Sequence, residues 1–117
     1  MSTFTSKLDK LNRKPTFNVD TTDFKYLKLA DIFNSEDEIH VINGVFITES
    51  QYGLNPVIIS EKHKALINLP QHLAASIKLM LADTELINMV KDGKIGFTIY
   101  TYESHGRLCY SINYVKL

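Results

Sequence analysis

The chain has 117 residues, of which 44% are hydrophobic and 22% charged, a composition that is ordinary for one globular domain with one core. Its 13 basic and 13 acidic residues cancel, which counts against strong nucleic-acid binding. The single cysteine, Cys109, excludes an internal disulfide and favours a reducing compartment. Since no stretch is apolar enough for a signal peptide or a membrane span, we expect a cytoplasmic protein that does not enter a membrane.

The charges are unevenly distributed along the chain. Residues 1–30 hold six basic and three acidic residues, residues 31–61 hold six acidic and no basic ones, and residues 62–117 hold seven basic and four acidic ones. The three net charges are therefore +3, −6 and +3. If the first and last thirds meet in space, they form a basic face that attracts phosphate despite the zero sum. The alternative is that these charges only solvate the surface.

The first 22 residues are mostly polar, with isolated apolar side chains, and Pro15 blocks helix continuation. We therefore expect a loosely held N-terminal arm at residues 1–22 and a folded domain at residues 23–117. Residues 24–29 alternate in the manner of a β-strand, and the polar cluster at residues 34–38 ends this pattern.

A second β-type run covers residues 39–48, which are rich in β-branched side chains. Asn43-Gly44 in its middle suits a hairpin turn or a glycine bulge that lets one long strand coil, and we favour the bulge because the hairpin arms would be short. Residues 51–56 contain Gly, Asn and Pro and predict a loop. Two short strands are then expected, at residues 57–59 and 65–69, on either side of a charged turn at residues 60–64.

The period of the apolar residues changes from two to 3.6 after the last of these strands. Pro70 suits the first turn of a helix, and Asp83 suits the N-cap of a second helical piece. Gly93 stands where the glycine after a helix C-terminus belongs. We predict a helical region at residues 70–92, with an apolar face formed by Leu73, Ile77, Met80 and Leu81.

The end of the sequence alternates with a clean period of two. Residues 95–102 and 108–115 therefore predict two strands, joined as a hairpin by the turn at residues 103–106. The first strand has an apolar row of Ile95, Phe97 and Ile99 and an opposite row that ends in Tyr100 and Tyr102, and the second strand has Leu108, Tyr110, Ile112 and Tyr114 on one face.

This order of elements predicts a mainly β domain, a β-barrel with one helical insertion. One known solution is the OB-fold, a five-stranded Greek-key barrel, here with its helix between strands 3 and 4, that binds oligonucleotides on the face of its second and third strands. The long strand interrupted by glycine also fits barrel closure, which needs a sharply coiled strand. The alternative is an α+β roll, in which an open antiparallel sheet packs on the helix, and the pattern alone does not separate the two.

Five segments carry a family resemblance: Val45–Thr48, Tyr52–Val57, Asn68–Leu73, Lys91–Tyr102 and Tyr110–Leu117. In these segments the chain resembles small single-stranded DNA-binding proteins of phages of lactic acid bacteria, of the lactococcal siphophage type. The resemblance covers residues 24–117 and implies an OB-fold protein that coats single strands during phage DNA replication or recombination in an infected bacterial host. It also implies a homodimer and assistance to a host recombinase.

Sequence-independent binding of single strands needs aromatic rings on which bases stack and Lys or Arg that hold phosphates. Tyrosine is the useful aromatic here, because its hydroxyl lets the ring stand in water. Each tyrosine can instead be a half-buried barrel residue, and the cluster Lys62–Lys64 can be only a solvated turn. The candidate binding residues are Tyr52, Lys62, Lys64, Tyr100, Tyr102 and Arg107, followed by Tyr26 and Lys28, whereas Tyr110 and Tyr114 are expected to be structural and Phe46 and Phe97 to be core.

No other group of residues indicates a reaction. The four histidines lie on different predicted elements without paired ligand spacing, a lone strand cysteine is typical of a buried residue, and there is no phosphate-binding glycine loop. We therefore expect no enzymatic activity, no metal and no cofactor. The leading hypothesis is sequence-independent binding of single-stranded DNA. The alternative is a protein-interaction module, such as a phage inhibitor of a host factor, which the zero net charge and the acidic middle third favour.

Overall fold

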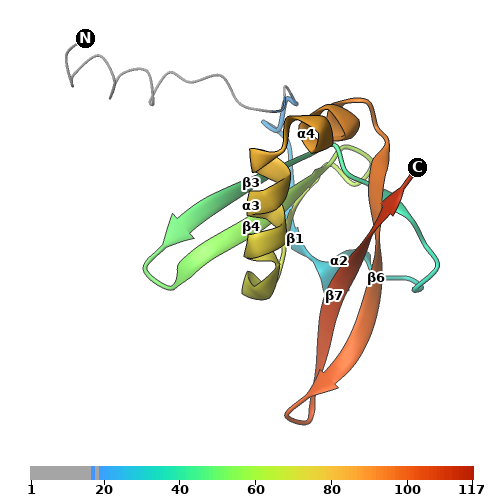
Figure 1. Cartoon of the computed structure of the whole chain (residues 1–117). Helices are drawn as coiled ribbons and strands as arrows, with labels where there is room; N and C mark the ends of the chain where they lie inside the picture. Colours follow the sequence, from blue (N-terminus) through green and yellow to red (C-terminus); the bar gives the residue numbers. More distant parts are fainter. Residues whose placement is uncertain (1–16, 18) are drawn as a thin grey trace.

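The computed structural model describes Phe17 and residues 19–117, so most of the expected N-terminal arm lies outside the described residues. The described chain is mainly β, as predicted, and forms two sheets with the orders β1-β5-β4-β3 and β2-β6-β7 (Figure 1). The strands are β1 (Lys25–Lys28), β2 (His40–Val41), β3 (Gly44–Ser50), β4 (Gly53–Ser60), β5 (Ala65–Asn68), β6 (Ile95–Ser104) and β7 (Arg107–Lys116). The helices are α2 (Leu29–Ile32), α3 (Ala74–Ala82) and α4 (Thr84–Lys91), with a 3-10 turn, η1 (Gln71–Leu73), before α3.

The two sheets are joined by one bent stretch of chain, β2 followed by β3. At the bend the Ile42 N–H donates to the Ile95 carbonyl of sheet β2-β6-β7, and the Asn43 N–H donates to the Ile59 carbonyl of the other sheet, both at 3.0 Å. A Cβ on Gly44 would lie 2.8 Å from Cδ1 of Ile59 and 3.0 Å from Cβ of Phe17, so a larger residue there would have to displace these side chains. The expected break at Asn43-Gly44 is thus present, but it divides the run into two strands, β2 and β3, that belong to different sheets, in place of one strand with a bulge.

On their other side the sheets do not meet, and no closed barrel forms among the described strands. β5 pairs antiparallel with β4 and parallel with β1, in the register Lys25↔Ala65 to Lys28↔Asn68. Because both edges of β5 are occupied, β7 has no partner there and the ring of strands stays open between β1 and β7. Short α2 follows β1 at this opening, and Phe33 packs edge-on against Tyr110 of β7 with ring centroids 5.8 Å apart.

The predicted loop at residues 51–56 was wrong. Only Gln51 and Tyr52 form the turn, and β4 begins at Gly53, whose φ of +118° favours glycine. Pro56 is tolerated inside this central strand because its carbonyl accepts from the Leu69 N–H (3.0 Å), just past the last β4–β5 pair, Val57↔Asn68. The nitrogen of Pro56 points to the same side, so no bond to β3 is lost.

The helical prediction is confirmed as two short helices. The Asp83 carboxylate caps α4 by accepting from the Glu85 and Leu86 N–H groups at 2.9 and 3.2 Å. Gly93 ends the helix with a φ of +70°, and α3 lies against β3 and β4 (Figure 1). In residues 19–117 no helix is both long and apolar enough to cross a membrane.

The predicted hairpin is confirmed as β6 and β7, which extend two residues and one residue further than expected toward the turn. His105 and Gly106 form this turn, with φ values of 52° and 74° that suit a tight hairpin. The row of Ile95, Phe97 and Ile99 is buried as expected and lies in one core with residues of both sheets and of α2, α3 and α4. Tyr114 is structural, since its hydroxyl lies 2.7 Å from Oγ of Ser76 on α3.

Candidate nucleic-acid interface

An apolar pocket of about 510 Å³ lies at the opening between β1 and β7. Its walls come from the end of β1 and the start of α2, from the end of β5, and from the β6–β7 hairpin. Among its lining residues only Lys28 and Asn68 have a charged or an amide side chain. The walls of the pocket are therefore mostly apolar. The lining residues are Lys28, Leu29, Ala30, Asn68, Leu69, Pro70, Tyr102, Leu108, Cys109 and Tyr110.

The pocket brings together two of the candidate binding residues, Lys28 of β1 and Tyr102 of β6, which are 74 positions apart in the sequence. The Lys28 backbone is fixed because its N–H donates to Oδ2 of Asp31 at 2.8 Å, while its side chain stays exposed. The Tyr102 ring is 37% exposed, and its centroid lies 6.1 Å from that of Tyr100. Partial desolvation, followed by the proximity of Cys109, raises the pKa of the Tyr102 hydroxyl above its usual 10, so the ring is neutral at physiological pH.

Tyr100, Tyr102 and Arg107 share one face of the β6–β7 hairpin. This follows from the register, in which Tyr100 pairs with Ser111, Tyr102 with Cys109, and Ser104 with Arg107. Arg107 is exposed near the tip of the hairpin. The two tyrosine rings and the guanidinium therefore form a short row beside the pocket. Binding of single strands requires such a row, in which aromatic rings stack on bases and a cation holds a phosphate.

Leu108 is a pocket residue that the sequence reasoning did not single out. Its alternation placed it in the apolar row with Ile112, but it is 62% exposed. The reason is that the hairpin extends beyond the core, so the inward row reaches solvent near the tip. An exposed leucine at the mouth of an apolar pocket is a better signal of binding than a single surface leucine elsewhere.

Tyr52 does not line the pocket and lies in the turn between β3 and β4. Its side chain is 80% exposed. The Tyr52 carbonyl accepts from Nε2 of Gln71 at 2.8 Å, and Gln71 directly follows Pro70 of the pocket wall. The turn that carries Tyr52 therefore contacts η1, and the residue before η1, Pro70, lines the pocket.

Tyr26 is 60% exposed on β1 and has the same strand parity as Lys28. Both side chains project from the outer strand of their sheet. Tyr26 lies two residues from the pocket wall and does not line it.

Lys62 and Lys64 are not brought to this pocket. They lie in the turn between β4 and β5, at the opposite end of β5 from Asn68, and a four-residue strand separates the two ends by about 10 Å. Nζ of Lys62 lies 4.0 Å from Oε1 of Glu38, with the lysine side chain 70% exposed. Both lysines are exposed, but they belong to a different surface.

Two acidic side chains lie close to the candidate interface. Asp31 bonds the backbone of Lys28, and Oε1 of Glu36 accepts from the Thr101 N–H at 3.3 Å, between the two candidate tyrosines of β6. Acidic residues of the 31–61 segment thus border the candidate interface. Four of the six basic residues of the first third, Lys7, Lys10, Arg13 and Lys14, lie outside the described residues.

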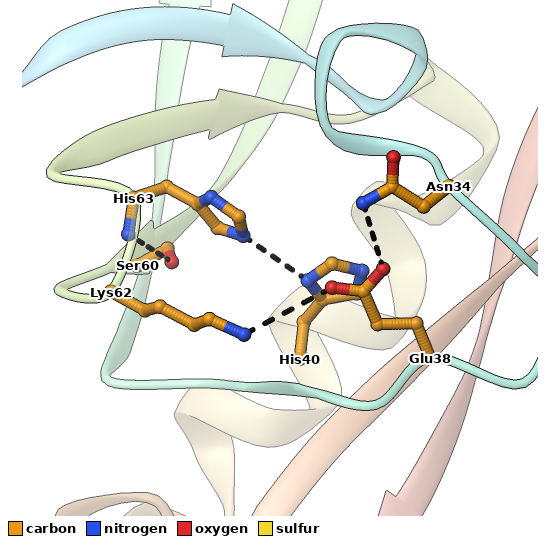
Figure 2. Close-up of polar contacts among 6 residues, drawn as sticks. All are labelled: Asn34, Glu38, His40, Ser60, Lys62 and His63. Atoms are coloured by element: carbon orange, nitrogen blue, oxygen red, sulfur yellow. Dashed lines mark hydrogen bonds and ion pairs between the residues drawn. The ribbon is translucent and has the colours of Figure 1, made fainter.

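The structure brings together two histidines that the sequence left apart (Figure 2). Nδ1 of His40 on β2 lies 3.3 Å from Nε2 of His63 in the β4–β5 turn. Metal-bound imidazoles usually come with further ligands and with a partner for the second ring nitrogen. Here Nε2 of His40 is buried without a hydrogen-bond partner, and no three His, Cys, Asp or Glu side chains among the described residues gather in a metal-binding group. This pair is therefore a hydrogen-bonded contact.

Comparison of the chain with protein-family models, with curated proteins and with solved structures finds no match in any of the three. The resemblance to phage single-strand binders, and with it the homodimer and the host recombinase, therefore stays a prediction from the sequence.

Proposed function

We propose that this chain binds single-stranded DNA without sequence preference, on the surface that surrounds the pocket between β1 and β7. The observation that carries the proposal is the convergence of Lys28, Tyr102 and the exposed Leu108 on one apolar pocket. Its role would be the one that the family resemblance implies, the coating of single strands during phage DNA replication or recombination.

The chemistry of the pocket fits bases better than phosphates. Apolar walls and tyrosine rings offer stacking, which is worth about 1–3 kcal/mol per base. Lys28 and Arg107 are the cations of this surface, and acidic residues border it. We therefore expect affinity to come mainly from base contacts, with a slope of log K against log salt of only about −1.4 for two phosphate contacts.

The order of the strands supports an OB-type arrangement for this site. In that arrangement the bent pair β2–β3 is strand 1, β4 and β5 are strands 2 and 3, and β6 and β7 are strands 4 and 5, with α3 and α4 after strand 3. β1 is then an additional strand beside β5. OB-folds bind oligonucleotides on strands 2 and 3 and on the loops after strands 1 and 4, and the pocket lies at the end of β5 with Tyr52 and Arg107 near those two loops.

The proposal is tested by fluorescence anisotropy of a labelled oligo-dT at low and high salt. Leu108→Ser should weaken binding, because it places a hydroxyl at the mouth of the pocket. Leu79→Ser on α3 is a matched control, since Leu79 is 70% exposed and does not line the pocket. If the wild type does not bind at low salt, the proposal is overturned and the protein-interaction alternative is favoured. Equal losses of affinity in both variants would show that the pocket is not the binding site.

A further inference from the structure

His40 is a buried imidazole at the place where the two sheets join. Its side chain is 2% exposed, and its ring is stacked on Phe97 of β6 with centroids 5.1 Å apart and an interplanar angle of 25°. One ring nitrogen, Nδ1, contacts His63, and the other, Nε2, has no partner. A buried imidazole with an unpartnered nitrogen is far more stable neutral than charged.

The charged groups around His40 come from two segments. Glu38 belongs to the chain just before β2, Lys62 and His63 belong to the β4–β5 turn, and the neighbour on β6 is the uncharged Phe97. Burial lowers the pKa of His40 below its usual 6.5, Glu38 opposes this effect, and His63 and Lys62 add to it. Glu38 is already engaged, since its Oε2 accepts from Nδ2 of Asn34 at 3.1 Å and its Oε1 faces Lys62 (Figure 2).

His63 connects this buried ring to the β4–β5 turn. The turn is also held by the Glu61 N–H, which donates to Oδ1 of Asn43 at 2.9 Å, and by the Lys64 carbonyl, which accepts from the Lys25 N–H of β1 at 3.2 Å. The contact between two imidazoles needs one N–H and one lone pair. It therefore exists only while at least one of the two rings is neutral, and two protonated rings repel each other.

We propose that the His40–His63 contact is an acid-sensitive latch that fastens the β4–β5 turn to the junction of the two sheets. The latch is closed while at least one of the two imidazoles is neutral and opens when both are protonated. Opening releases the turn that carries Lys62 and Lys64 and weakens the hold of that turn on β1. The proposal rests on the geometry of these residues and does not depend on DNA binding.

The test compares amide hydrogen exchange at pH 7.5 and pH 5.0, corrected for intrinsic exchange rates, in the full chain. The informative amides are those of Lys25 and Lys64, which donate to carbonyls of the turn at 3.2 Å. Substituting His40 would remove a core side chain, so the variant is His63→Asn. The matched control is His105→Asn, because His105 lies in an exposed turn at a φ of 52° that asparagine tolerates.

We expect the protection of both amides to fall several-fold on acidification in the wild type and in His105→Asn. In His63→Asn their protection should already be low at pH 7.5 and should change little with pH. Unchanged protection in the wild type across this range would overturn the proposal. The same fall in His63→Asn as in the wild type would overturn it as well, because the change would then come from another group.

Discussion

The two ends of β5 have different surroundings, and we call them the open end, at Asn68, and the tied end, at the β4–β5 turn. At its C-terminal end, Asn68 opens into an apolar pocket whose mouth exposes Tyr102 and Leu108. At its N-terminal end, the β4–β5 turn is tied to the sheet junction by His63 and by the Glu61–Asn43 hydrogen bond. If bases bind at the pocket, as proposed, basic residues alone do not mark the binding surface of this chain. Lys62 and Lys64 belong to the tied end, whereas the rings and apolar surface that bases require lie at the open end.

The largest effect should come from the core beside the tied end. Phe97 is fully buried and stacks on His40, so Phe97→Ala should lower the free energy of unfolding by about 3–5 kcal/mol. Urea unfolding measures this change. Leu108→Ala at the open end is the contrast, and a comparable loss there would show that Leu108 is a core residue rather than an exposed pocket residue.

Tyr102→Ala should weaken oligo-dT binding by about 1–3 kcal/mol, or roughly 5- to 150-fold, because one stacking ring is lost. Its melting temperature should change little, since the ring is partly exposed. Tyr114→Ala should behave in the opposite way, because Tyr114 is half-buried and contacts Ser76. Anisotropy and thermal unfolding of both variants separate the two roles, and a strongly destabilised Tyr102→Ala would assign that ring to the core.

The tied end should make stability depend on pH. Burial lowers the pKa of His40 below 6.5 in the folded state, so the unfolded chain takes up this proton at a higher pH than the folded chain. The contribution of His40 is therefore complete well above pH 6.5 and is lost as the pH falls below 6.5 toward the folded pKa.

Urea unfolding between pH 7.5 and 5.0 measures this loss in a range above the usual pKa of carboxylates. His40→Leu should have a shallower dependence on pH than the wild type. A dependence of equal steepness in both proteins would assign the loss to other groups.

The sequence predicted some of these structural features and missed others. Local patterns predicted the β6–β7 hairpin, the N-cap at Asp83 and the helix end at Gly93, because period and capping depend on neighbouring residues. The local pattern predicted a loop at residues 51–56, but Pro56 lies inside β4. The nitrogen of Pro56 faces β5, so the missing N–H breaks no hydrogen bond with β3. Whether an N–H is needed at Pro56 depends on where β5 ends, and the short stretch of sequence around Pro56 does not contain that information.

The site was predicted in part for the same reason. The candidate set contained Lys28 and Tyr102, but the parallel pairing of β1 with β5 that brings β1 to the pocket joins segments 40 residues apart. Leu108 was missed because alternation assigns a face and does not say where the core ends. The contact between His40 and His63 was missed because it needs the bend between β2 and β3.

The smallest effect should distinguish the lysines at the two ends. Lys28→Gln should reduce the salt slope of oligo-dT binding by about 0.7, the value of one phosphate contact on a single strand. Lys62→Gln should leave both the slope and the affinity unchanged. It should also change stability by well under 1 kcal/mol, since its pair with Glu38 is exposed and long. If Lys62→Gln changed the salt slope more than Lys28→Gln did, the phosphate contact would lie at the β4–β5 turn and not at the pocket.

The most direct measurement is a map of backbone amide chemical shifts of the full chain during titration with oligo-dT. The proposed binding surface predicts shifts at residues 28–30, 68, 69, 102 and 107–110, with residues 61–64 unchanged. Shifts that centre on residues 61–64, or no shifts at saturating oligonucleotide, would contradict it.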